Sequence, residues 1–415
     1  MAIKKIKIKN FKSFDEEEIN LGKFNVLIGA NASGKSNLIQ IFKFLRDIAN
    51  HGLENAVQMQ GGVEYLRNVN IGSDENFSVS VVFDKEFKIY WKDVKKDKIW
   101  MKGYEAIYEF EIKFKKRGMG FEIVNDILIW NGQFVREGKN EKKLGEGKII
   151  FSGVNKKIEV VQNMPEEFQL KKNQGILSLL DEKYIKIKFL DFLEMPSLLP
   201  LASLKSEKVF SDIAIYDFDP KLSKESTKIT GKAELEENGS NLSIVLNNLI
   251  KDKDKKRKLF NLVKDSLPFI DDLDVKKHED KSLLFKLKET YSKTQYLPAS
   301  LMSDGTINIT ALIIALYFEE KSLTIIEEPE RNIHPYLISK VVEMMRDASQ
   351  KKQVIVTTHN PEILKYCGIE NILLVSRNKE GFSKISRPGD KDEVKAFLKN
   401  EIGIEELYVQ NLLEI

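Results

Sequence analysis

The sequence predicts an α/β fold built around a mostly parallel sheet, and three features indicate it. The apolar run from residue 24 to 28 is followed by a glycine-rich stretch and then by apolar residues at helical spacing. The last third of the chain alternates apolar strands with helices, which is typical of a sheet covered on both faces. Between these regions, short aromatic and β-branched segments predict an inserted antiparallel sheet.

Composition limits the class of protein. At 415 residues the chain can form two subdomains, or one domain with a large insertion. The net charge of +3 does not by itself indicate a nucleic-acid binder, and lysine clusters such as residues 251–258 are typical of solvated surface. Cys367 is the single cysteine, which excludes an intramolecular disulfide and a cysteine-based metal site. No signal peptide or membrane-spanning run is visible, so we expect a cytoplasmic protein without a membrane partner.

We predict three parts: residues 1–75 and 236–415 form one head, and residues 76–235 are inserted into it. The first part begins with a strand at residues 3–8 and an acidic edge hairpin at 15–18. The insertion begins as an antiparallel meander and turns helical over residues 166–204. Its predicted strands are FSVSVVF (77–83), FKIYW (87–91), YEAIYEFEIKF (104–114), GFEIVNDILIW (120–130) and KIIFSG (148–153).

The remaining elements follow from the same periodicities. Helices are predicted at residues 241–249, 257–267, 307–319 and 335–348, and strands at residues 283–287, 323–326, 354–356 and 372–375. No repeat and no sustained heptad pattern is visible, which argues against a long coiled coil.

The stretch after the first apolar strand fits the phosphate-loop pattern G-x-x-x-x-G-K-[ST]. Glycines allow backbone N–H groups to close around phosphate oxygens, and the N-terminus of the next helix adds partial positive charge. Lys35 would bind the β- and γ-phosphates, and the Ser36 hydroxyl would ligate Mg²⁺. The stretch therefore predicts binding of a nucleoside triphosphate. Its candidate nucleotide-binding residues are Gly29, Asn31, Ser33, Gly34, Lys35, Ser36 and Asn37.

A second set of candidates lies at the ends of later strands. Glu327 and Glu328 follow four apolar residues, which places both carboxylates at the sheet edge where α/β folds bind ligands. We expect Glu327 to support Mg²⁺ and Glu328 to polarise the attacking water. His359 ends the next strand and could hydrogen-bond the γ-phosphate or that water, although a lone histidine is more often structural.

The turn at Ser303, Asp304 and Gly305 precedes an apolar helix. A hydroxyl and a glycine at a helix N-terminus can form an anion site, and Ser303 or Asp304 can equally serve as the helix cap. Both roles remain open.

The order GANASGKS, SDGT, IIEEPE and TTHNP resembles the ABC-type ATPase heads of SMC-like, RecF-like and OLD (overcoming lysogenization defect) proteins. The opening IKNFKSF, His334-Pro335 after IIEEPE, and the ending GIEELYVQNLLE resemble the bacterial and archaeal ATPases grouped with OLD proteins. These motifs cover roughly residues 1–70 and 235–415, whereas the β-rich middle carries little resemblance.

The resemblance implies an ABC-type P-loop ATPase head with a mixed or parallel core sheet, using ATP and Mg²⁺. It also implies a homodimer, or a higher oligomer, in which Ser303, Asp304 and Gly305 of one subunit cap the ATP held by Lys35 and Ser36 of the other. Residues 331–332 would cross that interface. Gln60 is a weak candidate for a Mg²⁺ contact, and Lys12, Ser13 and Phe14 would lie near the base or α-phosphate. One departure is Glu327, where many such heads have aspartate.

Two functions follow from the resemblance. After His359, 56 residues remain, too few for the Toprim nuclease of OLD proteins, so the chain is expected to be an ATPase that regulates a separate nuclease or toxin in phage defence. The alternative is a DNA-repair ATPase acting directly on DNA. A transporter subunit is disfavoured by the β-rich insertion and the IKNFKSF opening.

Overall fold

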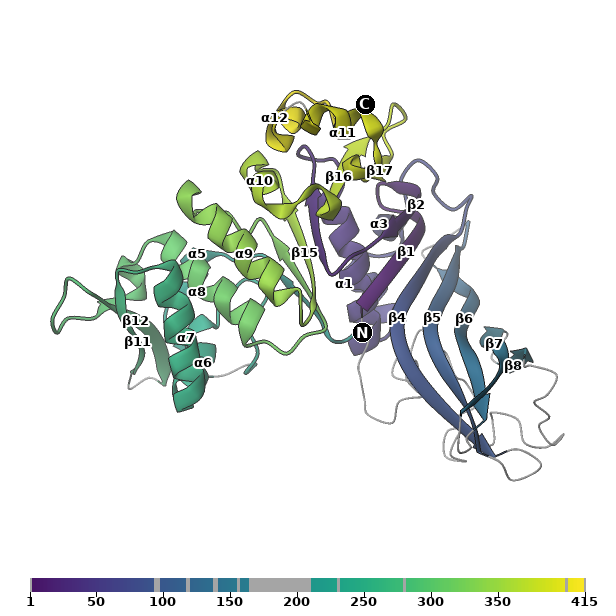
Figure 1. The fold of residues 1–415 in the computed structure, drawn as a ribbon, viewed down its shortest axis with the longest axis horizontal. Coiled ribbons are helices and arrows are strands. Elements are labelled where there is room, and N and C mark those ends of the chain that lie inside the picture. Colours follow the sequence, from purple (N-terminus) through teal and green to yellow (C-terminus); the bar gives the residue numbers. More distant parts are fainter. Residues whose placement is uncertain are drawn as a thin grey trace. The chain divides into compact units, whose positions relative to one another are not determined.

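The computed structural model describes residues 2–92, 98–116, 120–136, 141–154, 157–163, 210–229, 232–278, 281–399 and 402–413. The helical segment predicted at residues 166–204 lies outside these ranges. The chain forms two compact units (Figure 1). The first unit comprises Met1–Leu21, Ser36–Ile213 and Arg377–Lys384, and the second comprises Gly22–Lys35, Ala214–Ser376 and Ile385–Ile415.

The first unit is built on an antiparallel sheet, which over the described residues has seven strands in the order β2-β1-β4-β5-β6-β7-β8. The strands are β1 (Ala2–Phe11), β2 (Phe14–Asn20), β4 (Phe77–Lys92), β5 (Lys98–Phe114), β6 (Phe121–Arg136), β7 (Lys142–Val154) and β8 (Lys157–Asn163). The predicted edge hairpin and meander are confirmed. The prediction of two separate strands at 77–83 and 87–91 was wrong, because both stretches belong to one strand, β4. The register of β4 shifts between Asp84 and Phe87. Between the pairs Asp84–Glu105 and Phe87–Gly103, β4 has one residue more than β5, and a bulge of this kind lets the pairing continue on both sides.

Three helices accompany this sheet: α1 (Lys35–His51), α2 (Leu53–Met59) and α3 (Val63–Leu66). The apolar side of α1 packs on the sheet through aromatic side chains, since the Phe44 and Phe77 rings meet at 5.8 Å and the Phe77 and Phe110 rings at 5.7 Å. Helix α1 ends at His51, and Gly52 directly after it has φ 82°, the left-handed backbone typical of the residue that follows a helix.

The second unit contains the core sheet, with strand order β17-β16-β3-β15-β14-β9 over the described residues. The strands are β3 (Phe24–Ile28), β9 (Ile213–Tyr216), β14 (Leu323–Glu327), β15 (Gln353–Thr358), β16 (Ile372–Arg377) and β17 (Ser383–Ser386). Strands β14, β15, β3 and β16 run parallel to their neighbours in this group. The predicted α/β class with a parallel core sheet is confirmed.

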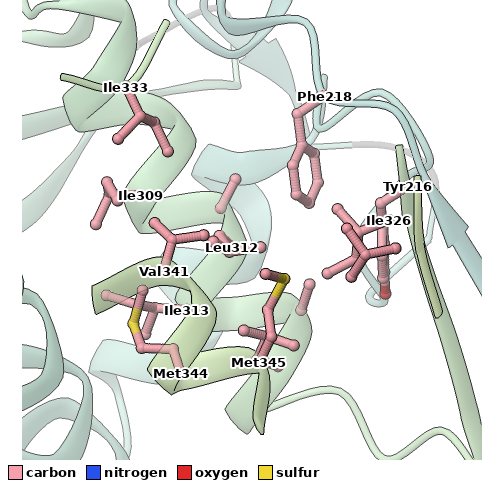
Figure 2. Close-up of a cluster of buried hydrophobic side chains, with 14 of the residues drawn as sticks. Tyr216, Phe218, Ile309, Leu312, Ile313, Ile326, Ile333, Val341, Met344 and Met345 are labelled. Atoms are coloured by element: carbon pink, nitrogen blue, oxygen red, sulfur yellow. The ribbon is translucent and has the colours of Figure 1, made fainter. Parts of the chain in front are cut away.

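Helix α8 (Asp304–Tyr317) is the centre of the second unit, because its residues 306–316 are all buried. In Figure 2, Leu312 and Ile313 of α8 pack beside Val341 and Met345 of α9 (Ile338–Ala348). The helix predicted at residues 335–348 begins only at Ile338, because Pro335–Leu337 form a 3₁₀ turn. Helix α8 begins three residues earlier than predicted because Ser303 caps it.

The rest of the second unit surrounds this core. The other elements are α5 (Pro220–Ser223), α6 (Leu242–Ile250), α7 (Lys253–Ser266), α10 (Leu364–Cys367), α11 (Asp392–Lys399), α12 (Ile404–Val409), and a small antiparallel sheet of β10 (Thr227–Lys228), β11 (Ile270–Lys277), β12 (Ser282–Glu289) and β13 (Leu297–Pro298). Among the helices that the structure describes, none is long and apolar enough to cross a membrane.

The domain boundaries drawn from the sequence stay predictions. The pairing of β1 with β4 joins residues from both sides of the predicted boundary at 75/76. This pairing makes the first residues of the chain part of the same sheet as the insertion.

Candidate functional site

Three parallel strands of the core sheet bring the predicted motifs to one edge. Strand register places Thr358 of β15 opposite Ile28 of β3, and Glu327 of β14 opposite Thr357 of β15. The glycine-rich loop follows Ile28, Glu328 follows β14, and His359 follows β15. Because parallel strands end at the same edge, the sequence motifs meet there, as predicted.

The glycine-rich loop has a shape that only glycine permits at its first position. A Cβ on Gly29 would lie 2.1 Å from the Val375 carbonyl oxygen and 2.8 Å from Ser33 Oγ. Gly34 has φ 118° and Ala32 has φ 63°, so the loop curls through left-handed backbone twice. Asn31 is exposed and Ser33 is buried. The result is a tight backbone ring of the kind that cradles phosphate oxygens.

The charged side chain of Lys35 is hydrogen-bonded to the backbone of the glycine-rich loop. Its Nζ donates to the carbonyl oxygens of Gly29 at 2.7 Å and Ala30 at 3.0 Å. Burial lowers the pKa of Lys35, and the negative charges of Glu328 and Glu327 oppose that shift. The two glutamates are therefore close enough to act on the lysine electrostatically, as expected of one shared site.

Ser36 and Asn37 follow in the first turn of α1. The Ser36 side chain is exposed. Asn37 Nδ2 donates to Ser13 Oγ at 2.7 Å, and this bond links the start of α1 to the turn between β1 and β2. Gln60 caps the C-terminal end of α2, and its buried Oε1 has no hydrogen-bond partner.

Ser36 and Gln60 of the first unit and Glu327 of the second each carry an oxygen of the kind that Mg²⁺ prefers as a ligand. Among the residues described, no cluster of three or more His, Cys, Asp or Glu side chains is arranged to hold a metal ion by itself.

Glu328 uses both carboxylate oxygens. His359 Nδ1 donates to Oε1 at 2.8 Å, since an ionised carboxylate can only accept. Arg331 donates to Oε2 from Nη2 at 3.0 Å and from Nε at 3.3 Å. Partial burial favours the neutral acid, but the hydrogen bonds and charges of Arg331 and His359 outweigh it and lower the pKa of Glu328. The carboxyl group is therefore ionised at neutral pH.

The backbone of Glu328 is also unusual. Its φ is 45°, in the left-handed region, and its N–H donates to the Thr357 carbonyl oxygen at 2.9 Å. Non-glycine residues rarely adopt this conformation, and such strain concentrates at functional sites.

His359 lies beside a cavity of about 380 Å³ lined by Glu328, Glu330, Arg331, His359, Asn360 and Pro361. Because Nδ1 donates to Glu328, Nε2 of the neutral ring is left as an acceptor. A neutral His359 can thus accept a hydrogen bond from water, and only the doubly protonated ring can donate to a phosphate oxygen.

Glu330, to which no sequence motif assigns a role, is only 7% exposed. The Thr358 hydroxyl donates to its Oε1, and its Oε2 is buried without a hydrogen-bond partner. Burial raises the pKa of Glu330, and the hydrogen bond from Thr358 opposes this. The contact ties the end of β15 to the loop after β14, so Glu330 orders the site.

The Ser303 turn caps α8. Ser303 Oγ accepts from the Thr306 N–H at 3.1 Å, which confirms the capping role. A Cβ on Gly305 would lie 2.7 Å from the Asn332 carbonyl oxygen, and Asn308 Nδ2 donates to the Arg331 carbonyl oxygen at 2.7 Å. The turn is thus packed directly against the loop that carries Arg331.

A separate cavity of about 370 Å³ lies in the first unit, lined by Lys12, Ser13, Asn37, Tyr65, Arg67, Asn68, Val69, Asn70, Arg377 and Gly381. The expectation that Lys12 and Ser13 face a ligand is compatible with this cavity. Phe14, in contrast, is fully buried in the hydrophobic core.

A glycine-rich loop between a parallel strand and a helix, with acidic residues ending a neighbouring strand, defines a P-loop nucleotide-binding protein of the α/β class. The chain belongs to the AAA_21 family, described as "AAA domain, putative AbiEii toxin, Type IV TA system", which it matches over residues 24–109 and 154–365. The match contains the glycine-rich loop, both glutamates and His359, and omits residues 110–153 of the meander.

Other comparisons give more distant likenesses. Over 90 residues, 21% of this chain and 10% of the relative, the sequence is 38% identical to Uncharacterized protein MJ1542 of Methanocaldococcus jannaschii. The chain thus spans about a tenth of that relative's length.

Solved structures of SMC heads also resemble the chain. An SmcHead bound to the C-winged helix domain of ScpA has TM-score 0.49 at 15% identity, covering 93% of this chain and 97% of that one. The SMC head domain from Thermotoga maritima has TM-score 0.43 at 14% identity, covering 93% and 99%. An Smc head with an extended coiled coil, bound to the C-terminal domain of ScpA derived from Pyrococcus furiosus, has TM-score 0.44 at 15% identity, covering 93% and 96%.

Proposed function

We propose that the protein hydrolyses ATP at the edge of its parallel sheet. The observation that carries this proposal is the position of ionised Glu328 at the same strand edge as the phosphate loop, hydrogen-bonded to His359. A carboxylate in that position can polarise a water molecule for in-line attack on the γ-phosphate.

The roles of the other residues follow from their chemistry. The loop from Gly29 to Lys35 binds phosphate oxygens through backbone N–H groups and the lysine charge. His359 orients Glu328 and accepts a hydrogen bond from water. Ser36, Glu327 and Gln60 would hold Mg²⁺, which neutralises phosphate charge when bound.

We further propose that two copies share their ATP sites, with the Ser303 turn of one facing the phosphate loop of the other. The turn has the features of an anion contact, namely an exposed hydroxyl and a glycine at a helix N-terminus. Leu301 and Tyr336 in the same unit are 70% and 65% exposed, and a dimer would cover apolar side chains of this kind. ATP binding would close the dimer and hydrolysis would open it.

The output of this cycle would be the control of a separate toxin or nuclease, in defence against phage. The family description names a toxin of a toxin–antitoxin system, which supports an effector-linked role for this chain. Isolation of the protein from its native host, with identification of the proteins that accompany it, tests this part of the proposal.

The catalytic proposal is tested with Glu328→Gln. The amide keeps the size of the side chain but cannot act as a base, so we expect ATP turnover to fall about 10²- to 10⁴-fold while ATP binding persists. The same variant should accumulate as an ATP-bound dimer in size-exclusion chromatography. Lys35→Ala serves as the binding-defective comparison, and unchanged turnover in Glu328→Gln would contradict the assignment.

A direct role on DNA is the second candidate, favoured by the exposed lysines at the start of α7. Lys253, Lys255 and Lys258 are exposed, while Arg257 is paired with Asp254. DNA affinity that falls steeply with salt, and less steeply after substitution of these lysines by glutamine, would support this reading.

A further inference from the structure

The segment from Asp217 to Lys224, which follows β9 and includes α5, carries no recognisable motif. It is fixed by several local contacts. The Asp217 N–H donates to the Glu237 carbonyl oxygen at 2.9 Å, and Asp219 caps α5 by accepting from the Lys221 N–H at 2.9 Å. The buried Ser223 hydroxyl donates to the Gly239 carbonyl oxygen at 2.8 Å. The side chains at its two ends therefore project from a well-anchored backbone.

At the first end of the segment, Asp217 binds Arg331, the arginine that contacts Glu328. Asp217 Oδ1 accepts from Arg331 Nη1 at 2.8 Å, while Nη2 and Nε of the same guanidinium face Glu328 Oε2. Arg331 is thus shared between two carboxylates, one of them on an element far away in sequence.

At the second end of the segment, Lys224 pairs with Asp304, the acidic residue of the Ser303 turn. Lys224 Nζ forms an ion pair with Asp304 Oδ1, and the two side chains are 21% and 38% exposed. Asp304 lies in the first turn of α8, directly after the capping Ser303.

We propose that Asp217 and Lys224 are positioning residues of the ATPase, which fix the arginine at Glu328 and neutralise Asp304 at the Ser303 turn. This inference rests on the proposed function. Both ion pairs involve the same eight-residue segment. One pair contacts the arginine at Glu328 and the other contacts the Ser303 turn, so one backbone segment positions both motifs.

The need for each contact is electrostatic. A carboxylate at a turn that faces a triphosphate repels it unless a cation compensates, and Lys224 supplies that cation. Oε2 of Glu328 must come free of Arg331 to bind water, and the existing bond to Asp217 then keeps the guanidinium in place. Without Asp217, the guanidinium binds Glu328 alone and the base is held more tightly.

Ion pairs as exposed as these contribute little to stability, so their loss should appear in kinetics rather than in unfolding. We expect Asp217→Asn to lower kcat about tenfold with little change in KM, because the contact acts on the base. Lys224→Met should raise KM for ATP about tenfold, because it leaves Asp304 uncompensated beside the triphosphate. Glu225→Gln and Lys221→Met, exposed neighbours with the same charge changes, serve as matched controls.

A double variant separates charge compensation from damage to the fold. If Lys224 acts by neutralising Asp304, then combining Lys224→Met with Asp304→Asn should reverse most of the rise in KM that Lys224→Met causes alone. Steady-state ATP hydrolysis and thermal unfolding are measured for every variant. Variants that match their controls, or a double variant that recovers nothing, overturn the inference. Absence of ATP hydrolysis by the unmodified protein instead overturns the proposed function.

Discussion

At the scale of single residues, two carboxyl groups two positions apart behave in opposite ways. Arg331 and His359 lower the pKa of Glu328 against its partial burial, whereas burial raises the pKa of Glu330. Environments that separate two pKa values in this way assign different roles to similar groups. We propose Glu328 as the base, and Glu330 as a structural acid whose burial favours its protonated form.

The raised pKa of Glu330 makes stability depend on pH. The native state binds this proton more tightly than the unfolded state, so the contribution is complete below the unfolded pKa and is lost as pH rises through the native pKa. Glu330→Gln removes this loss, and we expect it to stabilise the protein by about 1 kcal/mol at pH 8 while having little effect near pH 4. Thermal unfolding across pH measures the difference.

Glu320→Gln, at an exposed position, is the control for that measurement. A stability gain for Glu330→Gln that is equal at both pH values would show that Glu330 is ionised throughout the range.

At the scale of elements, the Ser303 turn and the loop after β14 are joined by a close backbone approach at Gly305. In a helix, replacing glycine by alanine normally stabilises by about 1 kcal/mol. Here the added Cβ would lie 2.7 Å from the Asn332 carbonyl oxygen, so the two elements must separate. We expect Gly305→Ala to destabilise by about 1–3 kcal/mol and to lower ATP turnover.

Gly22→Ala is the matched control for Gly305→Ala, because its Cβ would meet nothing closer than 3.5 Å. Chemical unfolding compares the two variants, and a stabilised Gly305→Ala protein would refute the close approach.

The elements also show how far the sequence predicts the structure. The phosphate loop and the ends of β14 and β15 carry local signals, since apolar runs end in polar residues there. The continuation of β4 through Asp84 has no such signal, because pairing with β5 decides it. Glu330 was missed for a related reason: its contact with Thr358 depends on strand register, and sequence spacing does not reveal that register. The ion pairs of Asp217 and Lys224 join segments about a hundred residues apart, beyond any local pattern.

At the scale of the whole molecule, shared ATP sites predict complementation between two inactive variants. Lys35→Ala removes the lysine of the phosphate loop, and Ser303→Gly removes the hydroxyl while leaving an acceptable helix cap. In a mixed dimer both changes fall in one site and the other site is intact. An equal mixture should therefore recover about a quarter of normal ATP turnover, given random pairing of subunits.

Each variant alone, at the same total concentration, is the control for the mixing experiment. A mixture no more active than its components would place each ATP site within one subunit.

The neighbours of β3 have a consequence for biosynthesis. This strand lies between β15 and β16, which begin at Gln353 and Ile372. During translation, the strand that leads into the phosphate loop leaves the ribosome more than three hundred residues before either of its partners. The nascent chain must keep an apolar segment unpaired until those strands emerge, and only then can it form the nucleotide pocket.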